Sequence, residues 1–449
     1  MSSGDTIAAG VSPSETISTN YRRYALTLLF LVYTLNFVDR QIVNILAELI
    51  KRDLHLTDWQ LGSLTGLSFA LFYATLALPI ARLAERSNRA KIVAISAIVW
   101  SAFTALCGAA HSFAQLFLAR VGVGVGEAGC TPASQSLISD YVPREKRASA
   151  MALFSLGIPA GSLVGMALGG LVADSLGWRM SFALVGIPGV LLGILTYFTL
   201  PEPRKLAAVA TVDTKTTNLK QALHTLRTKK TYVWLTTAMA FMSFGTYGQL
   251  AFQSSYFLRN HTGGLDRLAS QLDGAIGVQL GTTGFLGVVL GLVIGVFGAV
   301  GTWMGGWLSD RAGKTNVKAY VTIPAISAFL LPLSIFATYV SSNTVLVLTL
   351  IGMPMLLQSI YYGPLFGTVQ SLVDPRTRAT ASAILLFFAN LVGLGLGPLV
   401  IGVVSDILTP SLGSGDAIRW SLIIMSGVYF LAMGAFLMAR RTIEHDIVS

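Results

Sequence analysis

Charged residues are scarce in this chain: they make up 12% of its 449 residues, whereas hydrophobic residues make up 53%. The mean hydropathy is +0.67. Soluble domains carry about 25% charged residues, so this composition excludes an ordinary soluble protein. Cysteine is scarcer still, with only Cys107 and Cys130, both in apolar segments. Two such residues are typical of small core side chains and do not form a disulfide framework.

Signals for secretion and for common kinds of catalysis are also missing. Residues 1–20 are polar and rich in Ser and Thr, without the basic and apolar regions of a cleavable signal peptide. We therefore expect a disordered cytoplasmic tail there. The chain contains neither an HExxH nor a GxSxG motif. We expect no enzyme activity, no bound metal and no cofactor.

Two nucleotide-like motifs lack the context that they need. Residues 124–129 fit GxGxxG, but they lie in a long apolar segment with no preceding strand. Residues 313–315 read Gly-Lys-Thr, yet Leu308 stands where a P-loop requires its first glycine. The sequence therefore predicts no nucleotide site, and an ion gradient is the expected source of energy.

Long apolar runs are abundant instead. A membrane-spanning helix needs about 20 predominantly apolar residues. The sequence holds twelve such runs, at 24–50, 59–83, 91–110, 114–141, 147–173, 179–200, 231–258, 284–308, 318–340, 344–372, 379–405 and 419–439. If the N-terminus is inside, most of the 31 basic residues lie on the cytoplasmic side. The positive-inside rule then predicts that both termini are cytoplasmic, which explains the net charge of +10 without nucleic acid.

These features predict an all-α polytopic membrane protein in a plasma membrane or a bacterial inner membrane. The runs divide six and six at one long connection. We expect an N-terminal half at 21–200, a cytoplasmic linker at 201–230, a C-terminal half at 231–440 and a cytoplasmic tail at 441–449. Residues 81–89 match residues 306–314, and Arg147-Ala-Ser-Ala matches Arg378-Ala-Thr-Ala. These repeats occupy the same places in the two halves, which indicates an internal duplication.

The repeated segments also resemble a known signature. Residues 81–89 (ARLAERSNR) and 306–314 (GWLSDRAGK) resemble the loop motif of the major facilitator superfamily, and Arg120 resembles that superfamily's fourth-helix arginine. Within it, the spinster family is resembled by Asn36-Phe-Val-Asp-Arg40, Gly124-Val-Gly-Glu-Ala128 and Gly177-Trp-Arg179.

This resemblance implies twelve transmembrane helices in two parallel six-helix halves, with a substrate site near the midplane between them. It also implies transport by alternating access. The spinster family is associated with lysolipids and sphingosine phosphate, so a lysolipid-like amphipathic anion is the expected substrate. We expect a monomer embedded in the lipid bilayer.

Four ionisable residues lie inside the apolar runs. Asp39 and Arg40 belong to the first run, and Arg120 and Glu127 belong to the fourth. Such residues are costly in a membrane and mark functional sites. Counting about 1.5 Å of helical rise per residue, we expect Arg40 to pair with Glu127 and Asp39 to pair with Arg120.

This charge group predicts proton coupling. Desolvation favours a protonated carboxylic acid, whereas a neighbouring arginine opposes protonation, so a moving arginine changes the proton affinity. We predict Glu127 as the first proton carrier and Asp39 as the second. Arg40 and Arg120 are then their charge partners or hold an anionic headgroup. The alternative is a static ion-pair network that only keeps the helices in register. Four nearby glycines are expected to let the first helix approach the fourth: Gly122, Gly124, Gly126 and Gly129.

The second half of the chain carries no ionisable residue away from the ends of its runs. It therefore predicts a substrate wall without protonatable groups. Polar and aromatic candidates for this wall are Tyr247, Gln249, Gln358, Tyr361, Tyr362, Asn390, Phe244 and Phe387. Such a mixed lining suits an amphipathic ligand, although each of these side chains could instead serve helix packing.

The signature segments predict a cytoplasmic gate. Glu85 and Arg86 follow the second run, and Asp310 and Arg311 follow the eighth. A carboxylate at such a position can bind an arginine or a helix N-terminus. We predict a secondary transporter that couples protons to the movement of a lysolipid-like anion. The alternative cargo is another small organic anion or a drug, and an intramembrane enzyme or a gated channel are the rival classes.

Overall fold

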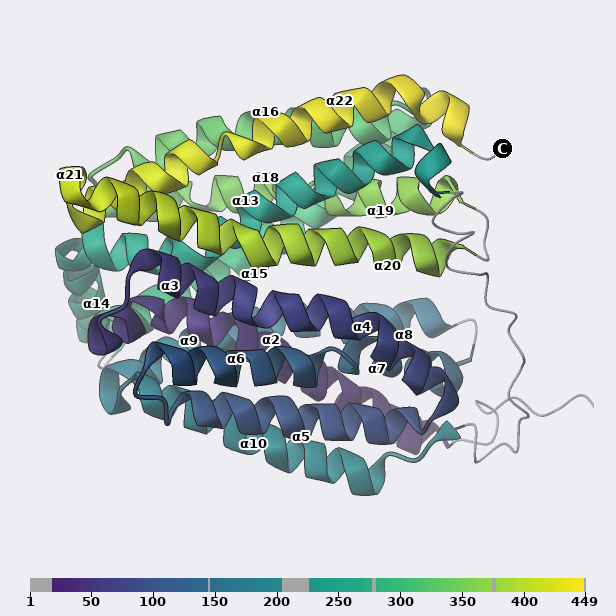
Figure 1. The fold of residues 1–449 in the computed structure, drawn as a ribbon, viewed down its shortest axis with the longest axis horizontal. Coiled ribbons are helices and arrows are strands. Elements are labelled where there is room, and N and C mark those ends of the chain that lie inside the picture. The colour runs from purple at the N-terminus through teal and green to yellow at the C-terminus, as the bar shows by residue number, and fades with distance from the viewer. Residues whose placement is uncertain (1–17, 144–145, 204–225, 277–279, 374–376, 448–449) are drawn as a thin grey trace, which may run out of the picture.

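The structure is a computed structural model that describes residues 18–143, 146–203, 226–276, 280–373 and 377–447. Its elements are helices that run side by side along one direction (Figure 1). The first helix, α2, begins and the last helix, α22, ends at the right-hand end of Figure 1, which we call the terminal end. The opposite end, where the first helix finishes at Leu54, is the distal end.

The N-terminal part of the chain forms six rods, which occupy the lower half of Figure 1. Several rods consist of two or three consecutive helices because a kink or a π-helical turn interrupts them. In chain order the rods are α2 (Thr19–Leu54); α3 (Asp58–Gly62), η1 (Ser63–Leu67) and α4 (Ser68–Arg86); α5 (Arg89–Cys107); α6 (Phe113–Glu127) and α7 (Cys130–Tyr141); α8 (Arg147–Ser155) and α9 (Gly157–Leu176); and α10 (Trp178–Thr199).

The C-terminal part forms six further rods in the upper half of Figure 1. They are α13 (Lys230–Asn260); α15 (Thr282–Gly313); α16 (Ala319–Tyr339); α17 (Thr344–Leu350), α18 (Gly352–Leu357) and α19 (Tyr362–Ser371); α20 (Arg378–Phe388), η3 (Ala389–Leu396) and the first part of α21 (Gly397–Met425); and the rest of α21 with α22 (Val428–Asp446). The last two rods part at Gly413, whose φ of 76° breaks the helix. In the part of the chain that the structure describes, the twelve predicted spans are thus twelve rods.

One helix was not expected from the sequence, and two predicted segments lie largely outside the described residues. An additional helix at the distal end, α14 (Thr262–Ile276), was not predicted. It is too short to span a bilayer, because about 20 residues are needed. The predicted N-terminal tail and most of the predicted linker fall on residues 1–17 and 204–225, which lie outside the described residues.

Eight segments of the described residues are long and apolar enough to cross a membrane. The segment from Thr380 to Asp446 includes the last two rods. Three rods are not long and apolar enough by themselves: those of α4, of α6 with α7, and of α13. These three rods are either broken or rich in polar side chains, and all three contribute to the site described below.

Glycines let two helices of opposite halves touch at the distal end. A Cβ built on Gly287 of α15 would lie 2.2 Å from the carbonyl oxygen of Met166 on α9. Toward the terminal end the same pair of helices separates. The corresponding distance is 3.1 Å from Gly291 to Leu163, and 3.9 Å from Gly295 to Pro159. Small residues permit such close helix contact, and here they do so on the distal side.

A second seam between the halves follows the same course. A Cβ on Gly62 would lie 2.2 Å from the carbonyl oxygen of Pro398, and one on Gly66 would lie 2.5 Å from that of Leu394. The Cβ position of Gly395 lies 3.5 Å from the Cβ of Ala70, which is one turn nearer the terminal end than Gly66. Both seams are therefore closed at the distal end, and the seam between α9 and α15 diverges toward the terminal end.

We expect Gly287→Leu to weaken the closed distal seam, because a side chain there collides with backbone. Overpacking of this kind costs about 1–3 kcal/mol. Spin labels on Ser175→Cys and Ser270→Cys, both exposed at the distal end, should move apart in this variant. Gly306→Leu is the matched control, because nothing lies within 4 Å of its Cβ position. An unchanged label distance in Gly287→Leu would contradict the assignment of this seam.

Candidate functional site

An ion pair between the first and fourth rods lies at the centre of the N-terminal half. Arg40 of α2 donates from Nε to Oε2 of Glu127, at the end of α6, over 2.8 Å. Its Nη2 lies 2.8 Å from the same oxygen. The Glu127 side chain is fully buried, whereas 16% of the Arg40 side chain is exposed. The contact predicted from helical depth is therefore present.

Aromatic rings surround the guanidinium group of Arg40. Its Cζ atom lies 5.2 Å from the ring centroid of Phe37, 4.8 Å from that of Phe69 and 4.6 Å from that of Tyr73. Cation–π contacts of this kind stabilise a desolvated cation by about 2 kcal/mol or more. The two rings from α4 were not predicted, because nothing in the sequence separates Phe69 and Tyr73 from ordinary core aromatics. These three rings, together with Glu127, offset part of the cost of burying the guanidinium cation.

Arg120 and Asp39 do not form the predicted ion pair. Both are buried, and they are close enough to interact electrostatically. Nevertheless Nε and Nη1 of Arg120 and Oδ1 of Asp39 have no hydrogen-bond partner among the described residues. Trp100 and Thr104 of α5 lie beside the carboxylate of Asp39. Arg120 instead lies 5.6 Å from the ring of Phe69.

The glycines of the fourth rod contact other helices than the first helix, which was the predicted neighbour. A Cβ on Gly124 would lie 2.6 Å from the carbonyl oxygen of Phe69, and one on Gly126 would lie 2.6 Å from the backbone nitrogen of Trp100. Gly122 faces the ring of Phe103, and Gly129 faces Ile80. These contacts belong to α4 and α5, so the expectation that these glycines admit the first helix is wrong. Gly161 of α9 lets the first helix approach the fifth rod, with a Cβ position 2.4 Å from the carbonyl oxygen of Thr34.

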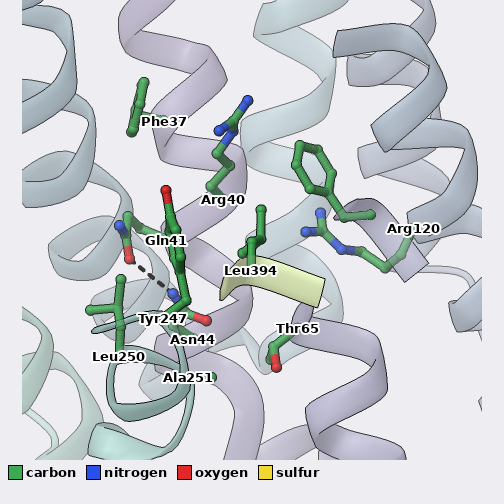
Figure 2. A pocket seen from close by; sticks show the side chains of 11 residues that line it. Phe37, Arg40, Gln41, Asn44, Thr65, Arg120, Tyr247, Leu250, Ala251 and Leu394 are labelled. Atoms are coloured by element: carbon green, nitrogen blue, oxygen red, sulfur yellow. Dashed lines mark hydrogen bonds between the residues drawn. The ribbon is translucent and has the colours of Figure 1, made fainter. Parts of the chain in front are cut away.

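A pocket lies between the two halves, next to these charges. It is lined by Phe37, Arg40, Gln41, Asn44, Thr65, Phe69, Arg120, Tyr247, Leu250, Ala251 and Leu394. Figure 2 shows Arg40 and Arg120 on separate helices of the first half, with Tyr247 and Leu250 from α13 nearby. Gln41 accepts a hydrogen bond of 3.0 Å from Asn44 at the edge of the pocket. Both arginines line the pocket, whereas Asp39 and Glu127 lie behind them.

The predicted substrate wall is only partly at this pocket. Tyr247 lines it, and Tyr362 interacts with Tyr247. Tyr361 stacks on Tyr362 with ring centroids 4.3 Å apart but is fully buried. Three further candidates are half-buried, and two are buried within their own half. The half-buried ones are Phe244, Phe387 and Asn390, and the buried ones are Gln249 and Gln358.

An ion-pair cluster at the distal end joins the two halves. Arg259 of α13 donates from Nη1 and Nη2 to the two carboxylate oxygens of Asp58, over 2.9 and 2.7 Å. Its Nε donates to Glu48 of α2 over 2.8 Å. Lys51 also contacts Asp58, at 2.5 Å. Sequence reasoning missed this cluster, because its members lie at the ends of separate runs and look like ordinary solvated charges.

Hydrogen bonds also join the two halves at the second distal seam. The carboxylate of Asp406 on α21 accepts hydrogen bonds from the backbone nitrogens of Asp58 and Trp59, over 2.9 and 2.7 Å. It thereby caps the start of α3 from the opposite half. Ser405 donates to Asp58 over 2.6 Å. Between described residues, the hydrogen bonds that join the two halves lie at this distal end.

Of the predicted gate residues at the terminal end, Asp310 and Arg311 have described side chains, and the contacts described for them lie within their own half. The side chains of Glu85 and Arg86 lie outside the described residues. Asp310 accepts a hydrogen bond of 2.9 Å from Tyr320, and Arg311 lies 5.5 Å from the ring of Trp307. Both contacts stay within the C-terminal half. The gate therefore remains a prediction for a conformation with the terminal end closed.

The fold and this pocket define a class of membrane transporter. A family model described as the Major Facilitator Superfamily matches residues 29–398, and the chain belongs to that superfamily. It is an integral membrane protein with many spans, as its apolar rods indicate.

Within the superfamily the chain is similar to the spinster proteins. It resembles the crystal structure of a bacterial homolog to the human lysosomal transporter Spinster, in an inward-facing and unoccupied conformation, with a TM-score of 0.83 and 28% identity over 96% of this chain and 100% of that chain. It is 27% identical to protein spinster homolog 3 of Danio rerio over 418 residues, which cover 89% of this chain and 80% of the relative. An MFS-type efflux pump of Mycolicibacterium smegmatis is 33% identical over 426 residues, 94% of both chains.

The distal cluster makes a prediction about pH. Burial alone would raise the pKa of Asp58, but the contacts with Arg259 and Lys51 outweigh it and lower the pKa to about 2. Since the ordinary value is about 3.9, the ionised carboxylate stabilises the closed distal end fully above about pH 5 and loses this effect as the pH falls toward 2. About half of the stabilisation should be gone at pH 3. Asp58→Asn should therefore lower the melting temperature clearly at pH 7 and less at pH 3.

The control for this prediction is Asp53→Asn. Asp53 pairs with Arg179 over 2.6 Å on the surface, where its side chain is 45% exposed, and such pairs contribute about 0–1 kcal/mol. If Asp58→Asn lowered the melting temperature no more than Asp53→Asn at pH 7, the distal cluster would not hold the halves together.

Proposed function

We propose that this protein is a proton-coupled secondary transporter that moves a lysolipid-like or lysosphingolipid-like amphipathic anion by alternating access. One observation carries the proposal: two arginines and several apolar side chains line a single pocket between the halves. An anionic headgroup binds at Arg40 and Arg120, as guanidinium groups bind phosphate and carboxylate. The hydrocarbon chain lies against Phe37, Leu250 and Leu394.

The two moving parts are the halves at 21–200 and 231–440, joined by the linker at 201–230. We place the terminal end in the cytoplasm, following the excess of basic residues near it. The present conformation is then inward-facing, because its distal seams are closed. No further chain is needed to complete the pocket, so the transporter works as a monomer in the bilayer.

Proton coupling follows from the arrangement of the charges. Arg40 is the side chain that both lines the pocket and pairs with Glu127. When a substrate anion attracts Arg40, Glu127 loses its counter-charge inside an apolar half and binds a proton. When the substrate leaves, Arg40 returns and the proton is released. Asp39 is the second carrier: it is an electrostatic neighbour of Arg120 without a bonded contact, so an anion that binds Arg120 changes the proton affinity of Asp39.

A second candidate cargo is another small organic anion or a drug. The relative from Mycolicibacterium smegmatis is described as an efflux pump, and the same two arginines suit any compact anion. The two classes of cargo differ in whether tight binding requires an apolar chain. Competition between lysophospholipids of increasing chain length and short soluble anions, measured on the purified protein, separates them. A rising affinity with chain length supports the lysolipid.

We expect Glu127→Gln to abolish the dependence of transport on a pH gradient, because the amide cannot bind the coupled proton. Asp39→Asn should weaken this dependence. The measurement is uptake of a labelled lysolipid into proteoliposomes with and without a pH gradient. Asp416→Asn is the control, since this carboxylate lies at the distal surface with 49% of its side chain exposed. If both Glu127→Gln and Asp39→Asn kept wild-type proton dependence, the coupling scheme would fail.

A further inference from the structure

A second cavity lies at the terminal end of the C-terminal half, away from the pocket between the halves. It has a volume of about 410 Å³ and is lined by Lys318, Leu437, Arg440 and Arg441. Lys318 precedes α16, and the other three belong to the end of α22. These two helices pack against each other along the outer side of their half (Figure 1). Three cations and one leucine thus share a hollow at the end of two neighbouring rods.

Exposed apolar side chains continue from this hollow along the two helices, and we call the open space that they flank at Gly434 the groove. On α16, Lys318, Ile326 and Phe329 share one face by helical spacing, and Ile326 is 53% exposed. On α22, Phe430, Gly434, Leu437 and Arg441 likewise share a face.

A contact between two aromatic rings connects the helices at the far end of the groove. The ring centroids of Phe329 and Phe430 lie 6.2 Å apart. Between this contact and the hollow, nothing lies within 4 Å of a Cβ position on Gly434. The glycine therefore leaves open space beside exposed apolar side chains, including Leu437, which is 40% exposed.

We propose that this hollow and groove bind an anionic phospholipid of the bilayer. The phosphate occupies the hollow between Lys318, Arg440 and Arg441, and an acyl chain follows the groove past Gly434. Exposed apolar side chains on an outer rod of a membrane protein face lipid, and basic hollows between such helices at the cytoplasmic side suit anionic headgroups. A charge-complementary ligand with an attached hydrocarbon chain matches both parts of the surface.

One carboxylate paired with a residue of the hollow opposes such a ligand. Glu444 of α22 lies 2.8 Å from Nζ of Lys318, with its side chain 52% exposed. It therefore competes with a phosphate for the same ammonium group. Removing this carboxylate frees Lys318 for the lipid, so the proposal predicts a gain of binding from a loss of an ion pair. A purely structural role of the pair predicts no such gain.

The test is a titration of the full-length protein in neutral detergent with phosphatidylglycerol that carries a fluorescent acyl chain, followed by anisotropy. Each basic residue near an anionic headgroup contributes about 1 kcal/mol, so Arg440→Gln with Arg441→Gln should weaken binding about 30-fold. Arg23→Gln with Arg267→Gln removes two exposed cations elsewhere, the second of them on α14 at the distal end, and should change binding less than about twofold. Glu444→Gln should tighten binding several-fold.

Two further measurements distinguish a lipid headgroup from free phosphate as the ligand of the hollow. Gly434→Leu fills the groove without a clash, so it should weaken binding of phosphatidylglycerol while leaving the hollow intact. Inorganic phosphate and glycerol phosphate should displace the lipid only at far higher concentration. Full displacement by inorganic phosphate together with an unchanged Gly434→Leu variant would identify a plain phosphate site and overturn the lipid assignment. Equal binding of phosphatidylcholine, or weaker binding in Glu444→Gln, would overturn it as well.

Discussion

The buried contact between Arg40 and Glu127 is the interaction on which the central site depends. Removing one partner of a buried ion pair costs about 3–5 kcal/mol, because the remaining charge is left in an apolar environment. Arg40 is held by its carboxylate on one side and by aromatic rings on the other, and its partly exposed side chain lines the pocket. The pair therefore connects a buried acid to the place where a ligand can bind.

Arg120 complements this pair. Two of its guanidinium nitrogens have no hydrogen-bond partner among the described residues, although the side chain is buried and lines the pocket. Buried polar groups without partners are rare, and a cation of this kind suits an anionic ligand. Asp39 lies behind it as an electrostatic neighbour rather than a bonded partner. The first half of the molecule thus offers two cations to the pocket and keeps two carboxylates out of it.

The distal end determines which side of the pocket is closed. Glycine contacts bring the backbones of opposite halves together there, and charged side chains such as Arg259 and Asp406 bridge them. The seam between α9 and α15 opens toward the terminal end, as the growing separations at Gly291 and Gly295 demonstrate. Since the two halves are separate helical bundles, movement of one half against the other would open the distal end and close the terminal end.

The sequence predicted the twelve rods because each apolar run has the length that a bilayer requires. It also predicted the contact of Arg40 with Glu127, because two charges at similar depth in an apolar bundle must find each other. It failed for Asp39 and Arg120, because helical depth does not specify their side-chain neighbours. Asp39 lies beside Trp100 and Thr104 of α5, and Arg120 lies near the ring of Phe69. It also missed the distal cluster, because Asp58, Arg259 and Asp406 become neighbours only when the halves assemble.

The most direct measurement of the central claim is proton exchange on ligand binding. The purified protein in weakly buffered solution with a pH-sensitive dye would be mixed with a lysolipid phosphate. We predict that the wild type takes up protons as it binds, and that Glu127→Gln binds the same ligand with much smaller proton uptake. Equal proton uptake by both proteins, or none by the wild type, would contradict the exchange of Arg40 between Glu127 and the ligand.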